Sequence, residues 1–206
     1  MPVHAAVIYY SATGNVFALA QAVVTGTEKA GAETRLRKVR ELAPDEAVAA
    51  NAGWQAHALE AQDVDEATLA DLEWADVIIF GTPTRYGNVA AQLKQFIDTT
   101  GPLWAAGKLA NKVYAGFVST GTAHGGQEST LLAMANTFYH WGGIIVPPGY
   151  VDPIQFVAGN PYGPSHISAN GANPPGETEL TSAEFTGRRC VEVAAALRAG
   201  GLGGSM

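Results

Sequence analysis

Short, continuous apolar segments alternate along the chain with longer segments in which apolar residues recur at helical spacing. The continuous segments predict strands that are buried on both faces, as in a parallel sheet. They lie at residues 3–10, 77–80, 113–118 and 143–146. In residues 33–39, the side chains Thr34, Leu36 and Lys38 alternate with Glu33, Arg35 and Arg37. This alternation predicts a weaker strand at a sheet edge. The periodic segments predict helices at residues 16–30, 89–99, 127–139 and 182–198.

The order of these elements predicts an α/β fold. We expect a flavodoxin-like, doubly wound sheet of five parallel strands in the order 2-1-3-4-5, with helices on both faces. The length of 206 residues suits a single domain over 1–206. Two long insertions are expected, at about 41–72, with a short helix at 67–72, and at 149–178, together with a flexible tail at 200–206.

Composition narrows the classes of partner. The formal net charge of −7 argues against a nucleic acid or an anionic membrane surface as the main partner. No apolar run approaches the ~20 residues that span a bilayer, and no secretory signal precedes the first strand, so we expect a cytoplasmic protein. Cys190 is the only cysteine, which excludes an internal disulfide and favours a buried structural thiol over a metal ligand.

The turn after the first strand has the composition of an anion site. It comprises Ser11, Ala12, Thr13, Gly14, Asn15 and Val16. Backbone N–H groups and hydroxyls at a helix N-terminus bind phosphate, and the first basic residue, Lys29, lies far along the helix. A single terminal phosphate, as in FMN, suits this short turn. An ordinary turn in which Ser11 or Thr13 caps the helix accounts for the same residues.

Two more loops of similar composition follow the third and fourth predicted strands. They span residues 82–88 and 119–127 and are rich in hydroxyl groups, glycine and backbone donors. Because the carboxyl ends of parallel strands meet at one sheet edge, all three loops should lie together. A flavin needs flat walls and donors near its pyrimidine edge. Tyr86 is a candidate wall and Arg85 a candidate positive group, although a solvated surface arginine is equally consistent.

Several motifs resemble the WrbA family of flavodoxin-like NAD(P)H:quinone oxidoreductases that bind FMN. They are GTPTRYGN at 81–88, TGPLW at 100–104, STGT at 119–122 with GGQE at 125–128, PPGY at 147–150 and PYG at 161–163. The resemblance covers nearly the whole chain. It implies that residues 11–16 bind the FMN phosphate and that Thr84, Arg85 and Tyr86 flank the ring. It also implies that Ser119, Thr120, Gly121, Thr122, Ala123 and His124 meet the pyrimidine side.

The resemblance assigns two further residues. His140 matches a family position beside the flavin and is a candidate catalytic group, although a histidine at a helix end commonly has a structural role. Trp104 matches a position that shapes the substrate site, and a core or interface anchor is the alternative. Family members form homotetramers in which neighbouring subunits help to wall the flavin site. The exposed-looking aromatics Trp54, Trp104 and Phe156 are consistent with such contacts.

The chain departs from the family pattern in its loops. Thr13 and Asn15 stand where tyrosine and histidine are frequent, and Ala123-His124 replaces a frequent glycine pair. These departures leave open whether NADH or NADPH is preferred. The expected function is two-electron, ping-pong reduction of quinones by NAD(P)H, with His140, His124 or bulk water protonating the quinol. The alternative is a one-electron carrier of flavodoxin type, which the charged content of 15% disfavours.

Overall fold

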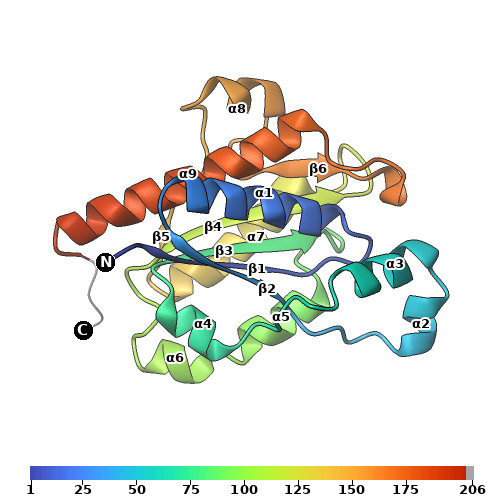
Figure 1. The fold of residues 1–206 in the computed structure, drawn as a ribbon, viewed down its shortest axis with the longest axis horizontal. Coiled ribbons are helices and arrows are strands. Elements are labelled where there is room, and N and C mark those ends of the chain that lie inside the picture. Colours follow the sequence, from blue (N-terminus) through green and yellow to red (C-terminus); the bar gives the residue numbers. More distant parts are fainter. Residues whose placement is uncertain (203–206) are drawn as a thin grey trace.

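A parallel sheet covered by helices on both faces forms the centre of the molecule (Figure 1). The computed structural model describes residues 1–202. The strands are β1 (His4–Tyr9), β2 (Glu33–Lys38), β3 (Val77–Pro83), β4 (Val113–Thr120), β5 (Ile144–Ile145) and β6 (Ser165–Ile167). The order β2-β1-β3-β4-β5 confirms the predicted flavodoxin-like sheet.

The number of strands corrects the prediction of five. A sixth strand, β6, pairs in parallel with Val118, Ser119 and Thr120 of β4. The fifth strand is only two residues long and pairs with the beginning of β4. The end of β4 would therefore lack a neighbour on that side, and β6 satisfies its backbone groups. The strand comes from the second insertion, whose Pro- and Gly-rich sequence gave no strand signal.

The helices form two layers. They are α1 (Asn15–Lys29), α2 (Asp45–Ala49), α3 (Ala52–Glu60), α4 (Leu69–Trp74), α5 (Ala91–Asp98), α6 (Gly101–Ala105), α7 (Gln127–His140), α8 (Pro153–Ala158) and α9 (Glu177–Ala199), with a 3₁₀ turn at Ala169–Gly171. Side chains of α1 and α9 share one buried cluster with the sheet. Side chains of α4, α5 and α7 share a second cluster on the opposite face.

Close packing of α1 against α9 depends on two glycines. A Cβ on Gly26 would lie 1.9 Å from the carbonyl oxygen of Glu184, and one on Gly187 would lie 2.3 Å from that of Val23. Cys190, one turn after Gly187, is fully buried, and burial raises the pKa of its thiol to about 12. This agrees with the predicted structural role of the cysteine.

Both insertions contain more regular structure than the sequence indicated. Residues 41–72 hold α2, α3 and the start of α4, which begins at Leu69 rather than at the expected residue 67. Residues 149–178 hold α8, β6 and the 3₁₀ turn. In the expected flexible tail at 200–206, Gly200, Gly201 and Leu202 donate their N–H groups to carbonyls of the last turn of α9, and residues 203–206 lie outside the described part. Among residues 1–202, no helix is long and apolar enough to cross a membrane.

Candidate functional site

A cavity of about 310 Å³ lies at the carboxyl edge of the sheet, where the three predicted loops meet. The predicted residues that line it are Ser11, Ala12, Thr13, Asn15, Val16, Thr84, Arg85, Ser119, Thr120 and Gly121. The loops therefore come together as expected, because each follows a strand of the same parallel sheet.

The turn after β1 leaves the N-terminus of α1 uncapped. Gly14 is the N-cap residue, with a left-handed φ of 89°, and no side chain of residues 1–202 caps the helix. The hydroxyl of Ser11 instead accepts from the N–H of Gly14, at 3.1 Å. The alternative that Ser11 or Thr13 caps the helix is therefore wrong. The free N–H groups of this turn remain available to an anion.

Asn15 adds a side-chain donor to this turn. The residue is 8% exposed and lines the cavity, and its Nδ2 is buried without a hydrogen-bond partner among the described residues. A buried amide donor without an acceptor costs about 1–3 kcal/mol, so such groups usually await a ligand or water. Together, the helix N-terminus and this amide form a set of neutral donors that suits an anion.

The 82–88 loop is held rigidly beside this turn. Thr84 donates its N–H to the Ser119 carbonyl at 2.9 Å, and its hydroxyl lies 2.6 Å from that of Thr130. Arg85 and Asn88 exchange backbone hydrogen bonds of 2.8 and 3.0 Å across a two-residue turn. Tyr86 has a φ of 53° in that turn, which is strained for a residue other than glycine. Its ring is fully exposed and does not line the cavity.

The end of β4 provides the opposite wall. Ser119 is buried, and its hydroxyl lies 3.0 Å from Nδ1 of His166 on β6. Burial lowers the pKa of His166, although the Glu179 carboxylate and the carbonyls of Pro174 and Asn173 oppose this shift. Thr120 donates its hydroxyl to the carbonyl of Thr122 at 2.8 Å. These contacts fix the two hydroxyl residues that face the cavity.

Other predicted residues do not line the cavity within this chain. Gly14, Tyr86, Thr122, Ala123, His124, His140 and Trp104 are not part of its lining. The last two lie together, with the Trp104 indole N–H donating to the His140 carbonyl at 3.0 Å. Helix α7 begins beside the cavity at Gln127 and ends at His140, so His140 lies toward the opposite edge of the sheet. A role for His140 or Trp104 at this cavity would require a second copy of the chain.

Sequence reasoning missed cavity residues from both insertions. Asn51 and Trp54 come from the first, and Ser168, Asn170 and Gly171 come from the second. The Asn170-Gly171 pair was a detectable signal, since Asn-Gly marks turns with positive φ, and these residues have φ values of 58° and 94°. Trp54 gave no such signal. It was expected to be exposed, but its indole points inward and it is half-buried.

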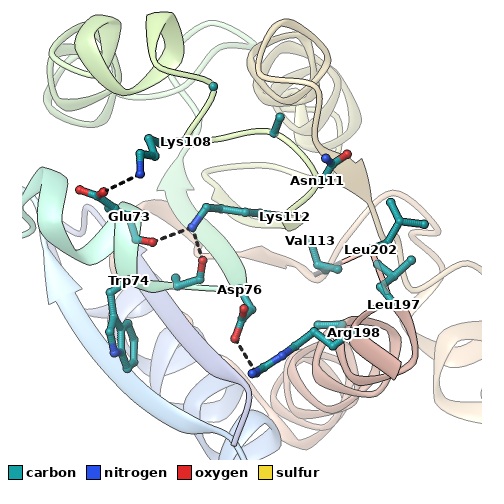
Figure 2. Close-up of a pocket in the computed structure, with 14 residues that line it drawn as sticks. Glu73, Trp74, Asp76, Lys108, Asn111, Lys112, Val113, Leu197, Arg198 and Leu202 are labelled. Carbon is teal, nitrogen blue, oxygen red and sulfur yellow. Dashed lines mark hydrogen bonds and ion pairs between the residues drawn. The ribbon is translucent and has the colours of Figure 1, made fainter. Parts of the chain in front are cut away.

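A second cavity, of about 300 Å³, lies at the opposite edge of the sheet (Figure 2). Lys112 donates to the carbonyls of Leu72, Glu73 and Ala75 at the end of α4, and burial lowers its pKa to about 8. Asp76 pairs with Arg198 at 3.0 Å. Because these charges already have partners, the second cavity has a structural character. The described residues contain no group of three or more candidate metal ligands.

Known proteins are similar to this chain in sequence. Residues 5–153 match the family described as NADPH-dependent FMN reductase. An NAD(P)H dehydrogenase (quinone) of Deinococcus radiodurans is 46% identical over 197 residues, covering 95% of this chain and 98% of that protein. NAD(P)H dehydrogenase (quinone) 3 of Rhizobium meliloti is 43% identical, covering 94% and 93%.

A solved structure gives the same result. The flavodoxin, WrbA-like protein from Agrobacterium tumefaciens superimposes with a TM-score of 0.67 at 26% identity. The alignment covers 94% of this chain and 98% of that one. With the relatives above, it confirms the resemblance noted from the GTPTRYGN motif. The chain belongs to the NADPH-dependent FMN reductase family and, within it, to the WrbA-like proteins.

Proposed function

We propose that this chain is an FMN-dependent NAD(P)H:quinone oxidoreductase. The observation that carries the proposal is the cavity at the carboxyl edge, where the N-terminus of α1 and the side-chain amide of Asn15, which has no partner among the described residues, offer neutral donors. Such donors fit the phosphate of FMN. The relatives named above support the activity, since two of them are named as NAD(P)H dehydrogenases with a quinone as acceptor.

Different residues of the cavity would bind different parts of FMN. Residues 11–16 would bind the phosphate, Thr84 and Arg85 would flank the ring, and Ser119 to Gly121 would supply donors toward its pyrimidine edge. Bound FMN supplies the redox chemistry by accepting a hydride and passing on two electrons. The positive charge of Arg85, at the cavity rim, would favour the reduced and more negative form of the cofactor.

We further propose that NAD(P)H and the quinone use one binding face in turn, which gives ping-pong kinetics and two-electron transfer. Tyr86 would contribute to that face from outside the cavity, because its strained backbone directs the ring into solvent. His124 or water would protonate the quinol. The single, buried cysteine is consistent with the cytoplasm as the compartment.

A homotetramer is part of the proposal. Trp104 is 56% exposed and His140 is exposed at the end of α7, and neither lines the cavity of its own chain. A neighbouring copy would bring them to the site, with His140 a candidate proton donor and Trp104 a wall for the quinone. Tyr150 and Phe156 form an exposed aromatic pair that a subunit contact would bury.

Stopped-flow absorbance tests the proposal. Purified protein with added FMN is mixed with NADH or NADPH and then with benzoquinone, while the oxidised-flavin band is followed. We expect rapid bleaching, rapid recovery and no semiquinone band, together with parallel double-reciprocal plots in steady state. Tightly bound FMN that neither nucleotide bleaches, with a stable semiquinone on titration, would instead identify a one-electron carrier.

A further inference from the structure

The first insertion has few apolar contacts of its own. Helix α2 buries no residue, and α3 buries only His57. Burial of apolar area, which fixes most surface helices, is therefore small here. Yet α3 lies beside the phosphate-binding turn, since a Cβ on Gly53 would lie 3.7 Å from the methyl group of Thr13. We therefore expect polar contacts to hold this insertion in its orientation.

The carboxylate of Glu41 provides these contacts at the start of the insertion. Its Oε2 accepts from the hydroxyl of Tyr10 at 2.9 Å and from the indole N–H of Trp54 at 3.1 Å. Its Oε1 accepts from the side chain of Gln92 at 2.7 Å and from the N–H groups of Leu42 and Ala43. One carboxylate thus joins the end of β1, helix α5 and helix α3.

The hydrogen bonds to Glu41 stabilise its charged form. Burial by itself would raise the pKa of Glu41, but the hydrogen bonds from Ala43, Gln92, Tyr10 and Leu42 outweigh it and bring the pKa below its usual value. The carboxylate is therefore ionised at neutral pH. Hydrogen bonds to a charged acceptor are about twice as strong as neutral ones, so the orientation of Trp54 is well defined.

Trp54 lies between two cavities. It lines the proposed FMN cavity and also a neighbouring cavity of about 250 Å³ under α2 and α3. Ser11 lines both cavities as well. The Trp54 side chain is thus a wall that the two cavities share beside the proposed phosphate-binding turn.

We propose that Glu41 is a positioning residue that holds the Trp54 indole as a wall of the FMN cavity and thereby sets the affinity for FMN. The inference rests on the proposed function. Glu41 acts through Trp54, whose indole nitrogen can only donate and therefore depends on an acceptor at this place.

The variant E41Q separates Trp54 from the other partners of Glu41. Glutamine retains one oxygen for the N–H groups of Leu42 and Ala43, and its NH₂ group then faces Tyr10 and Trp54. The tyrosine hydroxyl can turn to accept, but the indole N–H loses its acceptor. W54F keeps the carboxylate network and removes only the indole. E46Q, at an exposed glutamate of α2, is the matched control for the loss of charge.

Two readouts test the proposal. Fluorine NMR of protein labelled with 5-fluorotryptophan follows the four tryptophans, and W54F identifies the signal of Trp54. We expect E41Q, but not E46Q, to shift that signal in the apo-protein, and FMN to shift it in the wild-type protein. Fluorescence titration should show that E41Q and W54F each raise the Kd for FMN roughly tenfold. The double variant should be no weaker than either single one.

Thermal unfolding of the apo-proteins shows whether each variant is folded. If E41Q is unfolded, the affinity of W54F for FMN alone tests the proposal. Wild-type affinity for FMN in W54F, or a Trp54 signal that E41Q leaves in place, would overturn the inference. Wild-type protein that binds no FMN would overturn the proposed function instead. The Trp54 signal of the apo-proteins then still decides whether Glu41 orients the indole.

Discussion

At Asn15, helix stability and phosphate binding favour different side chains. Its Nδ2 is buried at the first position of α1 without a hydrogen-bond partner in the part of the chain that the structure describes, so this group does not stabilise the apo-protein. A carboxylate at the same place would interact well with the helix dipole but repel a phosphate. A substitution of Asn15 by aspartate can therefore distinguish a role in helix stability from a role in phosphate binding.

We expect N15D to raise the Kd for FMN by about 10- to 100-fold, because it places a negative charge beside the phosphate. The free energy of unfolding of the apo-protein should stay within about 1 kcal/mol of the wild-type value. Fluorescence titration and urea unfolding measure the two quantities. N111D, at an exposed asparagine of the opposite edge, is the control. Unchanged FMN affinity in N15D would remove Asn15 from the binding site.

At the scale of elements, Asp71 joins β2 to α4. Its Oδ1 accepts from Arg35 and Arg37 on β2, at 3.1 and 3.2 Å, and its Oδ2 accepts from the N–H and hydroxyl of Thr68, the N-cap of α4. The residue is 3% exposed. Burial by itself would raise the pKa of Asp71, but the hydrogen bonds from Thr68 and Arg35 and the charge of Arg37 outweigh it and bring the pKa below its usual value.

D71N should lower the free energy of unfolding at pH 7 by about 3 kcal/mol, because it leaves two arginines without their buried partner. A carboxyl whose pKa is lowered by folding stabilises the protein above its unfolded pKa, and this contribution disappears as the pH falls through the folded value. The difference between wild type and D71N should therefore shrink below about pH 4. Urea unfolding from pH 7 to pH 3 measures it.

D65N provides the matched control for D71N. Asp65 pairs with the same Arg37, at 3.2 Å, but its side chain is 76% exposed. An exposed ion pair contributes about 0–1 kcal/mol, so D65N should have little effect at any pH. Equal losses in the two variants would show that burial of Asp71 is not the source of its contribution.

The contact between α1 and α9 depends on the absence of a side chain at Gly187. We expect G187A to lower the free energy of unfolding by about 1–3 kcal/mol, since the added methyl group would overlap the Val23 carbonyl and push the helices apart. G101A is the control, because a Cβ at Gly101 meets nothing within 4 Å. A stabilised G187A would mean that α9 shifts at no cost.

At the scale of the whole molecule, the proposed association of subunits gives a further prediction. Phe156 is 70% exposed and packs on Tyr150 with ring centroids 5.2 Å apart. If subunits meet at this pair, F156D should convert the proposed tetramer into smaller species in sedimentation velocity and reduce quinone turnover. L59D, at an exposed leucine of α3, should leave the assembly intact. The same sedimentation coefficient in F156D and wild type would place the contact elsewhere.

The sequence by itself determined the order of five strands of the sheet and the edge at which the candidate site lies. The strands β1, β3 and β4 are continuous apolar runs with turn residues at their ends, so local pattern specifies both the strands and the loops that follow them. The meeting of the loops then follows from the geometry of parallel strands. The GTPTRYGN motif identified the family for the same reason, because its residues are continuous in sequence and form the end of β3 and the loop that follows it.

Only the tertiary structure decided how the insertions complete the site. β6 joins the sheet because the end of β4 lacks a neighbour, and Trp54 turns inward because Glu41 offers an acceptor. It also placed His140 away from the cavity of its own chain. These features depend on pairs of residues far apart in the sequence, whose contact free energy leaves no periodic signal in either segment.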